Sequence, residues 1–355
     1  MKIPGKKINH IEQLFLHVQH DWNPMQQKKN ENFPISYLNW TKTRPQNWIN
    51  KCFSPGCKNQ TSLNHLLMKN GIVNQITSGG HAMELTTSRK EENYYHFRRT
   101  GLAKLMAIHG FCGECDHQLF KGIEGQYPVV PTNDKEGGKA ALAYSLRPIV
   151  HEINKLLGIK EFRRRAPFLS ENHQHCHSQS AVNEFFIAWL SRTAIAVQNE
   201  INSQSEINFH VRRLPRVEIC ASSIIIPPIE YCRFENENNW MFNFDLMGLL
   251  SEKTNYVILN VFPQQSESVV IMSTLCKEEK SIKLLDDFRS MSEGELMVFI
   301  SNSLINDIED WAISVELLRK IQLHTNSKID EIITKAKLKK IPPKEGINFF
   351  EIQNL

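Results

Sequence analysis

The sequence predicts an α+β protein in which a cysteine-bearing N-terminal region is followed by a helical middle and a mixed α+β C-terminal domain. Two pairs of cysteines stand between residues 46 and 127. Apolar residues recur at helical spacing over 139–157 and 181–201. After residue 211, β-branched and aromatic residues gather in short runs typical of strands. With 355 residues and 41% hydrophobic composition, the chain can bury a sizeable core.

These shifts in composition divide the chain into five segments. They are an N-terminal extension (1–45), the cysteine-bearing region (46–127), a helical region (128–210), an α+β C-terminal domain (211–325) and a basic C-terminal tail (326–355). The extension is polar, with one short helical pattern over His10–His20. The tail carries five lysines between Thr334 and Lys344, so we expect it to be mobile.

Local patterns predict the elements of the first half of the chain. Leu63–Ile76 has the apolar spacing of a helix. Thr77–Tyr95 is polar and contains a pair of glycines, which predicts a loop or a hairpin. Lys139–Leu157 and Ala181–Ile201 predict two helices, and the charged stretch Glu161–Asn172 between them predicts a linker or an exposed helix end.

The C-terminal domain combines strand-like and helix-like patterns. Strands are expected over Val217–Pro227, Trp240–Leu246, Tyr256–Phe262 and Ser268–Leu275. The last two flank a short polar connection, Pro263–Glu267, and therefore predict a hairpin. Helices are expected over Ile282–Phe288, Glu293–Ile305 and Asp310–Gln322.

Charge and hydropathy narrow the classes of function. The formal net charge of +4 permits an anionic partner without requiring one. No apolar run approaches the ~20 residues that span a bilayer, which predicts no membrane partner. The first residues lack the apolar core of a signal peptide, so we predict a cytoplasmic protein. In that reducing compartment, cysteines serve as metal ligands or buried thiols more often than in disulfides.

The four cysteines of residues 46–127 have the spacing of a metal site. Cys52 and Cys57 flank a Pro-Gly turn, and Cys112 and Cys115 form a C-x-x-C turn with a glycine inside it. Two such turns, brought together, supply the four thiolates of a structural zinc site. The alternative is a redox C-x-x-C, which is expected after the strand of a thioredoxin-like unit. No strand is expected before Cys112, so the sequence favours Zn²⁺.

Residues around these cysteines follow a further pattern. Between the pairs stands Thr61-Ser-Leu-Asn-His65, and the second pair leads into Cys115-Asp-His-Gln-Leu-Phe120-Lys-Gly-Ile-Glu124. This order resembles the cysteine-bearing HNH endonucleases, whose fold is a treble clef, also called ββα-metal. It also resembles an uncharacterised group of bacterial proteins, some of which belong to phage-defence or mobile elements. The resemblance covers about residues 48–127 and implies association with nucleic acid.

The resemblance also assigns roles to individual residues. In HNH nucleases the His after the first pair is the general base that deprotonates water, and that position is His65 here. The preceding position, usually an Asp or His that binds the catalytic Mg²⁺ or Mn²⁺, is Asn64 here. The residue after the last cysteine, usually a His of the metal site, is Asp116, with His117 one step later. The implied activity is metal-dependent cleavage of DNA or RNA.

Simpler roles remain open for the same residues. His65 can be a packing residue beside the zinc site, Asp116 a helix N-cap, and Glu124 a surface residue. The zinc fold would then be a non-catalytic scaffold, and the C-terminal domain would recognise a partner protein or nucleic acid of a defence system. Geometry separates the two hypotheses. Convergence of His65 with Asp116 or His117 on one open point favours the nuclease, whereas packing of Asn64 and His65 under a helix excludes it.

Other clusters carry weaker signals. His173, His175, Cys176 and His177 could bind a second metal, although a polar loop before the long helix is the simpler interpretation. The arginine runs 98–99, 163–165 and 212–213 could contact phosphates, although solvated charges are the default. Three further cysteines fall in strand-like stretches and predict buried thiols: Cys220, Cys232 and Cys276. Signatures of nucleotide-binding loops and serine nucleophiles are missing from the sequence.

Overall fold

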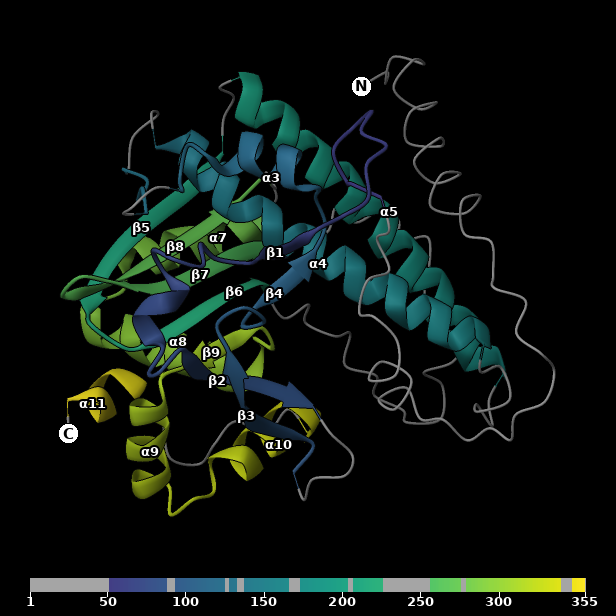
Figure 1. Ribbon diagram of the computed structural model, residues 1–355. Coiled ribbons are helices and arrows are strands. Elements are labelled where there is room, and N and C mark those ends of the chain that lie inside the picture. Colours follow the sequence, from purple (N-terminus) through teal and green to yellow (C-terminus); the bar gives the residue numbers. More distant parts are fainter. Residues whose placement is uncertain are drawn as a thin grey trace.

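The computed structural model has a mixed α+β fold, as predicted, built around an antiparallel sheet (Figure 1). It describes residues 51–87, 93–124, 128–132, 137–165, 173–203, 207–225, 256–275, 279–339 and 347–354. The helix expected over His10–His20 and the strand expected over Trp240–Leu246 lie outside the described residues.

Seven strands form the main sheet, in the order β3-β2-β9-β6-β7-β8-β5, and every neighbouring pair is antiparallel. Their bounds are β2 His81–Thr87, β3 Tyr95–Gly101, β5 Asn208–Pro215, β6 Ile219–Ile225, β7 Val257–Gln264, β8 Glu267–Thr274 and β9 Trp311–Ile313. The predicted hairpin is confirmed as β7 and β8. The sheet unites strands from the ranges 46–127 and 211–325, which the sequence separates into different segments.

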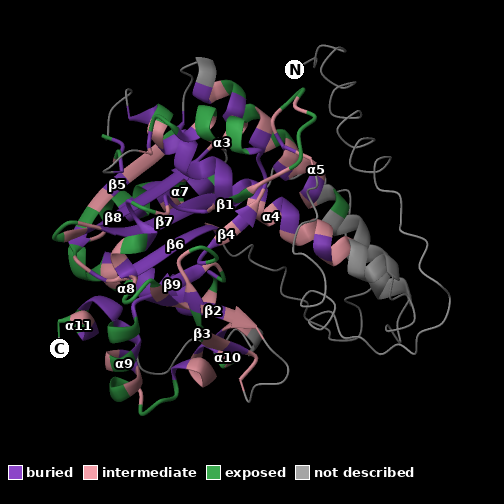
Figure 2. Ribbon diagram, in the orientation of Figure 1, coloured by how far each residue is buried: buried purple, intermediate pink, exposed green. Residues whose placement is uncertain are grey.

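Both faces of this sheet are covered, as the burial colours show (Figure 2). Along β7, Ile258 and Phe262 face one core, and Val257 and Leu259 face the other. This alternation follows from the two-residue period of a strand. The first core lies under α4 (Gly138–Arg165) and α5 (His173–Ser203), with which the cysteine-bearing region packs.

The two long helices confirm the helical middle but extend it. Residues 161–165, expected in a linker or helix end, belong to α4. Residues 173–177, expected in a polar loop, form the first turns of α5, so the loop prediction is wrong. Eight of the ten residues in 181–190 are apolar or small and favour this helix, and the polar segment before them forms its start.

Within the described residues, five helices follow on the other side of the sheet: α7 Glu279–Ser290, α8 Glu293–Asn306, α9 Val315–His324, α10 Ile329–Lys339 and α11 Phe349–Gln353. The single helix expected over Asp310–Gln322 is wrong, because Trp311–Ile313 pairs as β9 between two strands. Ser314 then caps α9 by accepting a hydrogen bond from the Leu317 N–H.

The basic tail is more ordered than its composition predicts. Lys335, Lys337 and Lys339 lie in α10, which packs against β3. Lys337 Nζ donates to the Ile308 carbonyl at 2.6 Å and lies 5.7 Å from the centre of the Tyr95 ring. The expected mobile tail is therefore wrong for Ile329–Lys339, because the buried side chains of Ile329, Ile333 and Ala336 anchor this helix.

A second, two-stranded sheet belongs to the cysteine-bearing region. β1 (Leu63–His65) pairs with β4 (Ala107–His109), and η1 (Val73–Ile76) is a 3₁₀ turn. The helix expected over Leu63–Ile76 is wrong, because pairing with β4 holds its first residues extended. The β2–β3 hairpin lies between β1 and β4 in sequence and confirms the hairpin expected near Thr77–Tyr95. Among the described helices, none is long and apolar enough to cross a membrane.

Candidate metal centre and adjoining cleft

The four cysteines of residues 46–127 converge as predicted. Their sulfur atoms all lie within 4.8 Å of one another, and Cys57 Sγ is 3.8 Å from Cys112 Sγ. Four thiolates at the Zn–S distance of about 2.3 Å stand about 3.8 Å apart at the corners of a tetrahedron. The donor set and its dimensions therefore fit a zinc ion held by Cys52, Cys57, Cys112 and Cys115.

Two turns present these sulfurs. The first is closed by the Cys57 N–H, which donates to the Ser54 carbonyl at 3.1 Å, and Gly56 supplies the positive φ of +79°. The second opens α3 (Gly113–Phe120), where Cys112 Sγ accepts from the Cys115 N–H at 3.5 Å. The Phe53 N–H donates to the Gly110 carbonyl at 2.8 Å and ties the two turns together.

The pKa of one of these thiols, Cys112, is shifted toward the thiolate that a cation binds. The Cys115 N–H lowers the pKa of Cys112 to about 7, whereas burial raises the pKa of Cys115 to about 12. Burial also raises the pKa of Cys52. A divalent metal supplies the positive charge that lets all four release their protons.

The strand before Cys112 differs from the expectation that weighed against a redox C-x-x-C. A strand, β4, does precede Cys112, although none was expected there. Among the described strands, however, β4 pairs with β1 in the small sheet and takes no place in the seven-stranded one. The clustering of the other cysteine pair around Cys112 and Cys115 favours metal binding on its own.

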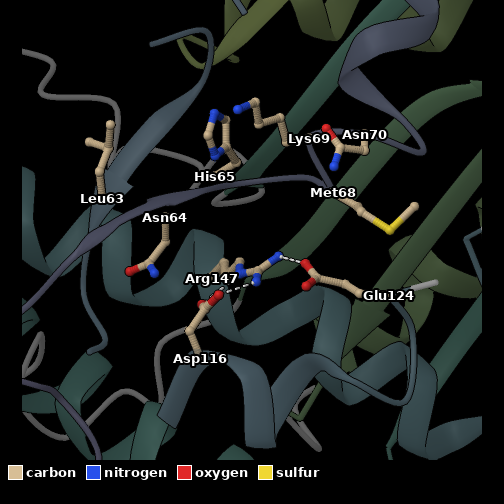
Figure 3. Close-up of a pocket in the computed structure, with 9 residues that line it drawn as sticks. All are labelled: Leu63, Asn64, His65, Met68, Lys69, Asn70, Asp116, Glu124 and Arg147. Atoms are coloured by element: carbon tan, nitrogen blue, oxygen red, sulfur yellow. Dashed lines mark hydrogen bonds and ion pairs between the residues drawn. The ribbon is translucent and has the colours of Figure 1, made fainter. Parts of the chain in front are cut away.

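A cleft of about 330 Å³ adjoins this centre (Figure 3). Its lining residues are Leu63, Asn64, His65, Met68, Lys69, Asn70, Asp116, Glu124 and Arg147. The cleft thus brings together His65 from β1 and Asp116 from α3, and none of the four cysteines lines it. His117, the third catalytic candidate, is exposed on α3 and does not line the cleft.

His65 is held as a neutral ring. Burial lowers the pKa of His65, and its Nε2 lies 3.2 Å from the Leu102 carbonyl oxygen. A neutral imidazole bonded to a carbonyl donates from that nitrogen, so Nδ1 is the acceptor. The side chain of Lys69 extends toward this ring along the same wall of the cleft (Figure 3). An acceptor nitrogen and an ammonium group therefore share one end of the cleft.

Arg147 dominates the opposite end. It reaches in from α4, donates from Nε and Nη2 to both oxygens of Asp116 at 3.3 and 2.9 Å, and donates from Nη1 to Glu124 at 2.5 Å. Its guanidinium lies 3.8 Å from the centre of the Phe120 ring, and its side chain is 4% exposed. Burial raises the pKa of Asp116, but Arg147 opposes this shift and stabilises the carboxylate.

Asn64 serves the local structure. It is buried, its Oδ1 accepts from the Phe111 N–H at 3.1 Å, and its Nδ2 donates to Ser62 Oγ at 3.3 Å. These bonds link β1 to the turn that holds Cys112. The amide oxygen expected to bind Mg²⁺ or Mn²⁺ is therefore directed at the backbone.

The other arginines and cysteines singled out from the sequence do not line the cleft. Arg98 and Arg99 are exposed on β3, at an edge of the main sheet. Arg212 binds the carbonyls at the end of α7, and Arg213 pairs with Glu267. The buried thiol predicted at residue 220 is confirmed. Cys232, Cys276 and the side chains of 163–165 and 173–177 lie outside the description.

Comparisons with protein-family models, with curated proteins and with solved structures found no match for this chain.

Proposed function

We propose that the chain is an HNH-like protein, organised by a structural zinc ion, that acts on nucleic acid in the cleft of His65. One observation carries the proposal. The first cysteine pair is followed by β1 and the second pair opens α3, and these two elements bring His65 and Asp116 to a single cleft apart from the sulfurs. A strand pair and a helix joined by four cysteines is also the arrangement that a treble clef requires.

The zinc ion has a scaffolding role in this proposal. Four protein thiolates complete its coordination and leave no open position for water or substrate, which is the mark of a structural site. What it supplies is the fixed placement of β1 and α3, and hence of the cleft. His65 then acts as the general base.

A catalytic Mg²⁺ or Mn²⁺ does not fit the residues present. Hard cations need several oxygen ligands. Arg147 engages three of the four carboxylate oxygens of Asp116 and Glu124, and Asn64 Oδ1 accepts from the backbone. We therefore assign no step to such an ion.

The test is a cleavage assay on end-labelled single- and double-stranded DNA and RNA, run with and without added Mg²⁺ or Mn²⁺. We expect His65→Ala to lower the rate by roughly 10²-fold or more, the usual contribution of a general base. His324→Ala, at the exposed end of α9, is the matched control and should retain the rate. Absence of cleavage by the wild type, or equal rates for wild type and His65→Ala, would refute catalysis.

A second candidate is a non-catalytic scaffold that binds nucleic acid. The observation in its favour is the full engagement of Asp116 by Arg147, which leaves the acidic group without a catalytic task. Exposed Arg98 and Arg99 on β3 would contact phosphates in this case. Salt-dependent binding that weakens in the double alanine variant, together with no cleavage of any substrate, would identify this function.

A further inference from the structure

We propose that the substrate of the His65 cleft is RNA, which is cleaved by attack of its own 2′-hydroxyl without a divalent cation. This inference rests on the proposed function and adds a substrate class and a nucleophile to it. The cleft already contains a cation, the guanidinium of Arg147, which lies between Asp116 and Glu124.

Arg147 occupies the carboxylates that would otherwise bind a metal ion, so this cleft cannot use metal-bound water as the nucleophile. A bound metal ion lowers the pKa of its water from 15.7 to about 7, and that route needs open oxygen ligands. Here the carboxylates that line the cleft are bonded to an arginine that is 4% exposed and held against Phe120. A nucleophile that needs only a base is therefore the one that this cleft can use.

RNA carries such a nucleophile beside every scissile phosphate. The 2′-hydroxyl is part of the substrate, so its attack is intramolecular, and well-oriented intramolecular reactions gain effective molarities of about 10⁵–10⁸ M. DNA lacks this group. The preference for RNA follows from the chemistry of the cleft and needs no contact that reads a base.

The cleft has the groups that this reaction requires. Nδ1 of His65 is the acceptor for the hydroxyl proton, because Nε2 donates to the Leu102 carbonyl. The ammonium of Lys69, on the same wall, is placed to stabilise charge on the phosphate (Figure 3). Leu63 is 48% exposed at the lining and offers apolar surface to a base. The volume of about 330 Å³ falls at the lower end of small-ligand sites, which suits one nucleotide.

The step balances without a co-reactant. The 2′-hydroxyl gives its proton to His65 Nδ1 as the O2′–P bond forms, and the P–O5′ bond breaks. The departing 5′-oxygen takes a proton from solvent water, and His65 later returns its proton to solvent. The products are a 2′,3′-cyclic phosphate and a 5′-hydroxyl end, with no oxidation, reduction or net consumption of water.

The experiment uses the full chain, loaded with zinc and without other added metal. The substrates are a single-stranded RNA, the same sequence in 2′-O-methyl RNA, and the same sequence in DNA. Mass spectrometry identifies the product ends. The variants are His65→Ala and Lys69→Ala, with His324→Ala and Lys328→Ala as exposed controls. Zinc content and circular dichroism verify that each variant is folded.

We expect RNA alone to be cleaved, with cyclic phosphate ends, and roughly 10²-fold slower cleavage by His65→Ala. Cleavage of DNA or 2′-O-methyl RNA, a strict need for Mg²⁺ or Mn²⁺, or 5′-phosphate products would overturn the RNA inference and leave the proposed nuclease intact. Failure of the wild type to cleave any of the substrates, with or without added Mg²⁺ or Mn²⁺, would overturn both.

Discussion

At the scale of single residues, Arg147 shows how the cleft is held. Its side chain is almost fully buried, and its planar fork matches the carboxylate of Asp116 while a third N–H reaches Glu124. No motif indicates this residue in the sequence, because it lies in a predicted helix well beyond the cysteine region. His65 and Asp116, by contrast, could be identified from their spacing relative to cysteines. The sequence therefore identifies His65 and Asp116 but not Arg147, whose guanidinium neutralises the Asp116 carboxylate.

The pairing of Arg147 predicts a large loss of stability on its removal. Arg147→Met keeps much of the side-chain volume but leaves Asp116 and Glu124 partly buried without their partner. We expect a loss of about 3–5 kcal/mol in the free energy of unfolding, measured by urea denaturation. The control is Arg213→Met, whose pair with Glu267 is about half exposed and should contribute less than about 1 kcal/mol. Equal losses for the two variants would contradict the account.

At the scale of elements, one ionic cluster joins α4 to the start of β9. Asp310 Oδ1 lies 3.0 Å from His151 Nε2, and its Oδ2 lies 3.1 Å from Lys155 Nζ. The Asp310 carbonyl also accepts from the Ser222 N–H of β6. Residues 159 positions apart in the chain meet here, so neither the cluster nor the three-residue strand that it precedes can be read from local sequence.

The charge of Asp310 predicts an acid-dependent loss of stability. Burial alone would raise the pKa of Asp310, but Lys155 and His151 outweigh it and hold the pKa well below its usual value. A carboxyl with a depressed folded pKa contributes fully above about pH 4, its unfolded pKa, and loses that contribution as pH falls toward the folded pKa.

Asp310→Asn should therefore cost on the order of 3 kcal/mol at about pH 7 and flatten the decline in stability below about pH 4. Urea midpoints measured across this pH range test both effects. Glu267→Gln, at an exposed ion pair, should leave the acid decline as in the wild type. If Asp310→Asn kept the wild-type slope below pH 4, the assigned role of Asp310 would be wrong.

At the scale of the whole molecule, the cysteine-bearing region and the main sheet are not independent. The β2–β3 hairpin starts and ends within the region that the four cysteines organise, yet it pairs with β9 in the seven-stranded sheet. A glycine marks a second junction, since a Cβ at Gly110 would stand 2.6 Å from a methyl group of Val150 on α4. The sequence predicts the α+β class and most helices. It does not predict this shared sheet, because β2 and β9 lie more than 200 residues apart.

A zinc ion held by the four cysteines would therefore stabilise more than the two turns that bind it. Structural zinc sites bind with apparent free energies of about 10–16 kcal/mol, comparable with the net stability of a whole domain. Loss of zinc should release β1, α3 and the cleft, and should expose the 51–124 region to proteases.

The most direct test is the zinc content of the purified chain, measured by elemental mass spectrometry. We compare wild type, the double variant Cys52→Ser/Cys112→Ser, and Cys220→Ser, which changes a buried thiol outside the cluster. We expect one tightly held zinc ion per chain in the wild type and in Cys220→Ser. The double variant should lose that ion, with increased proteolysis of the 51–124 region. A folded wild type without zinc, or a double variant that keeps its zinc, would contradict the claim.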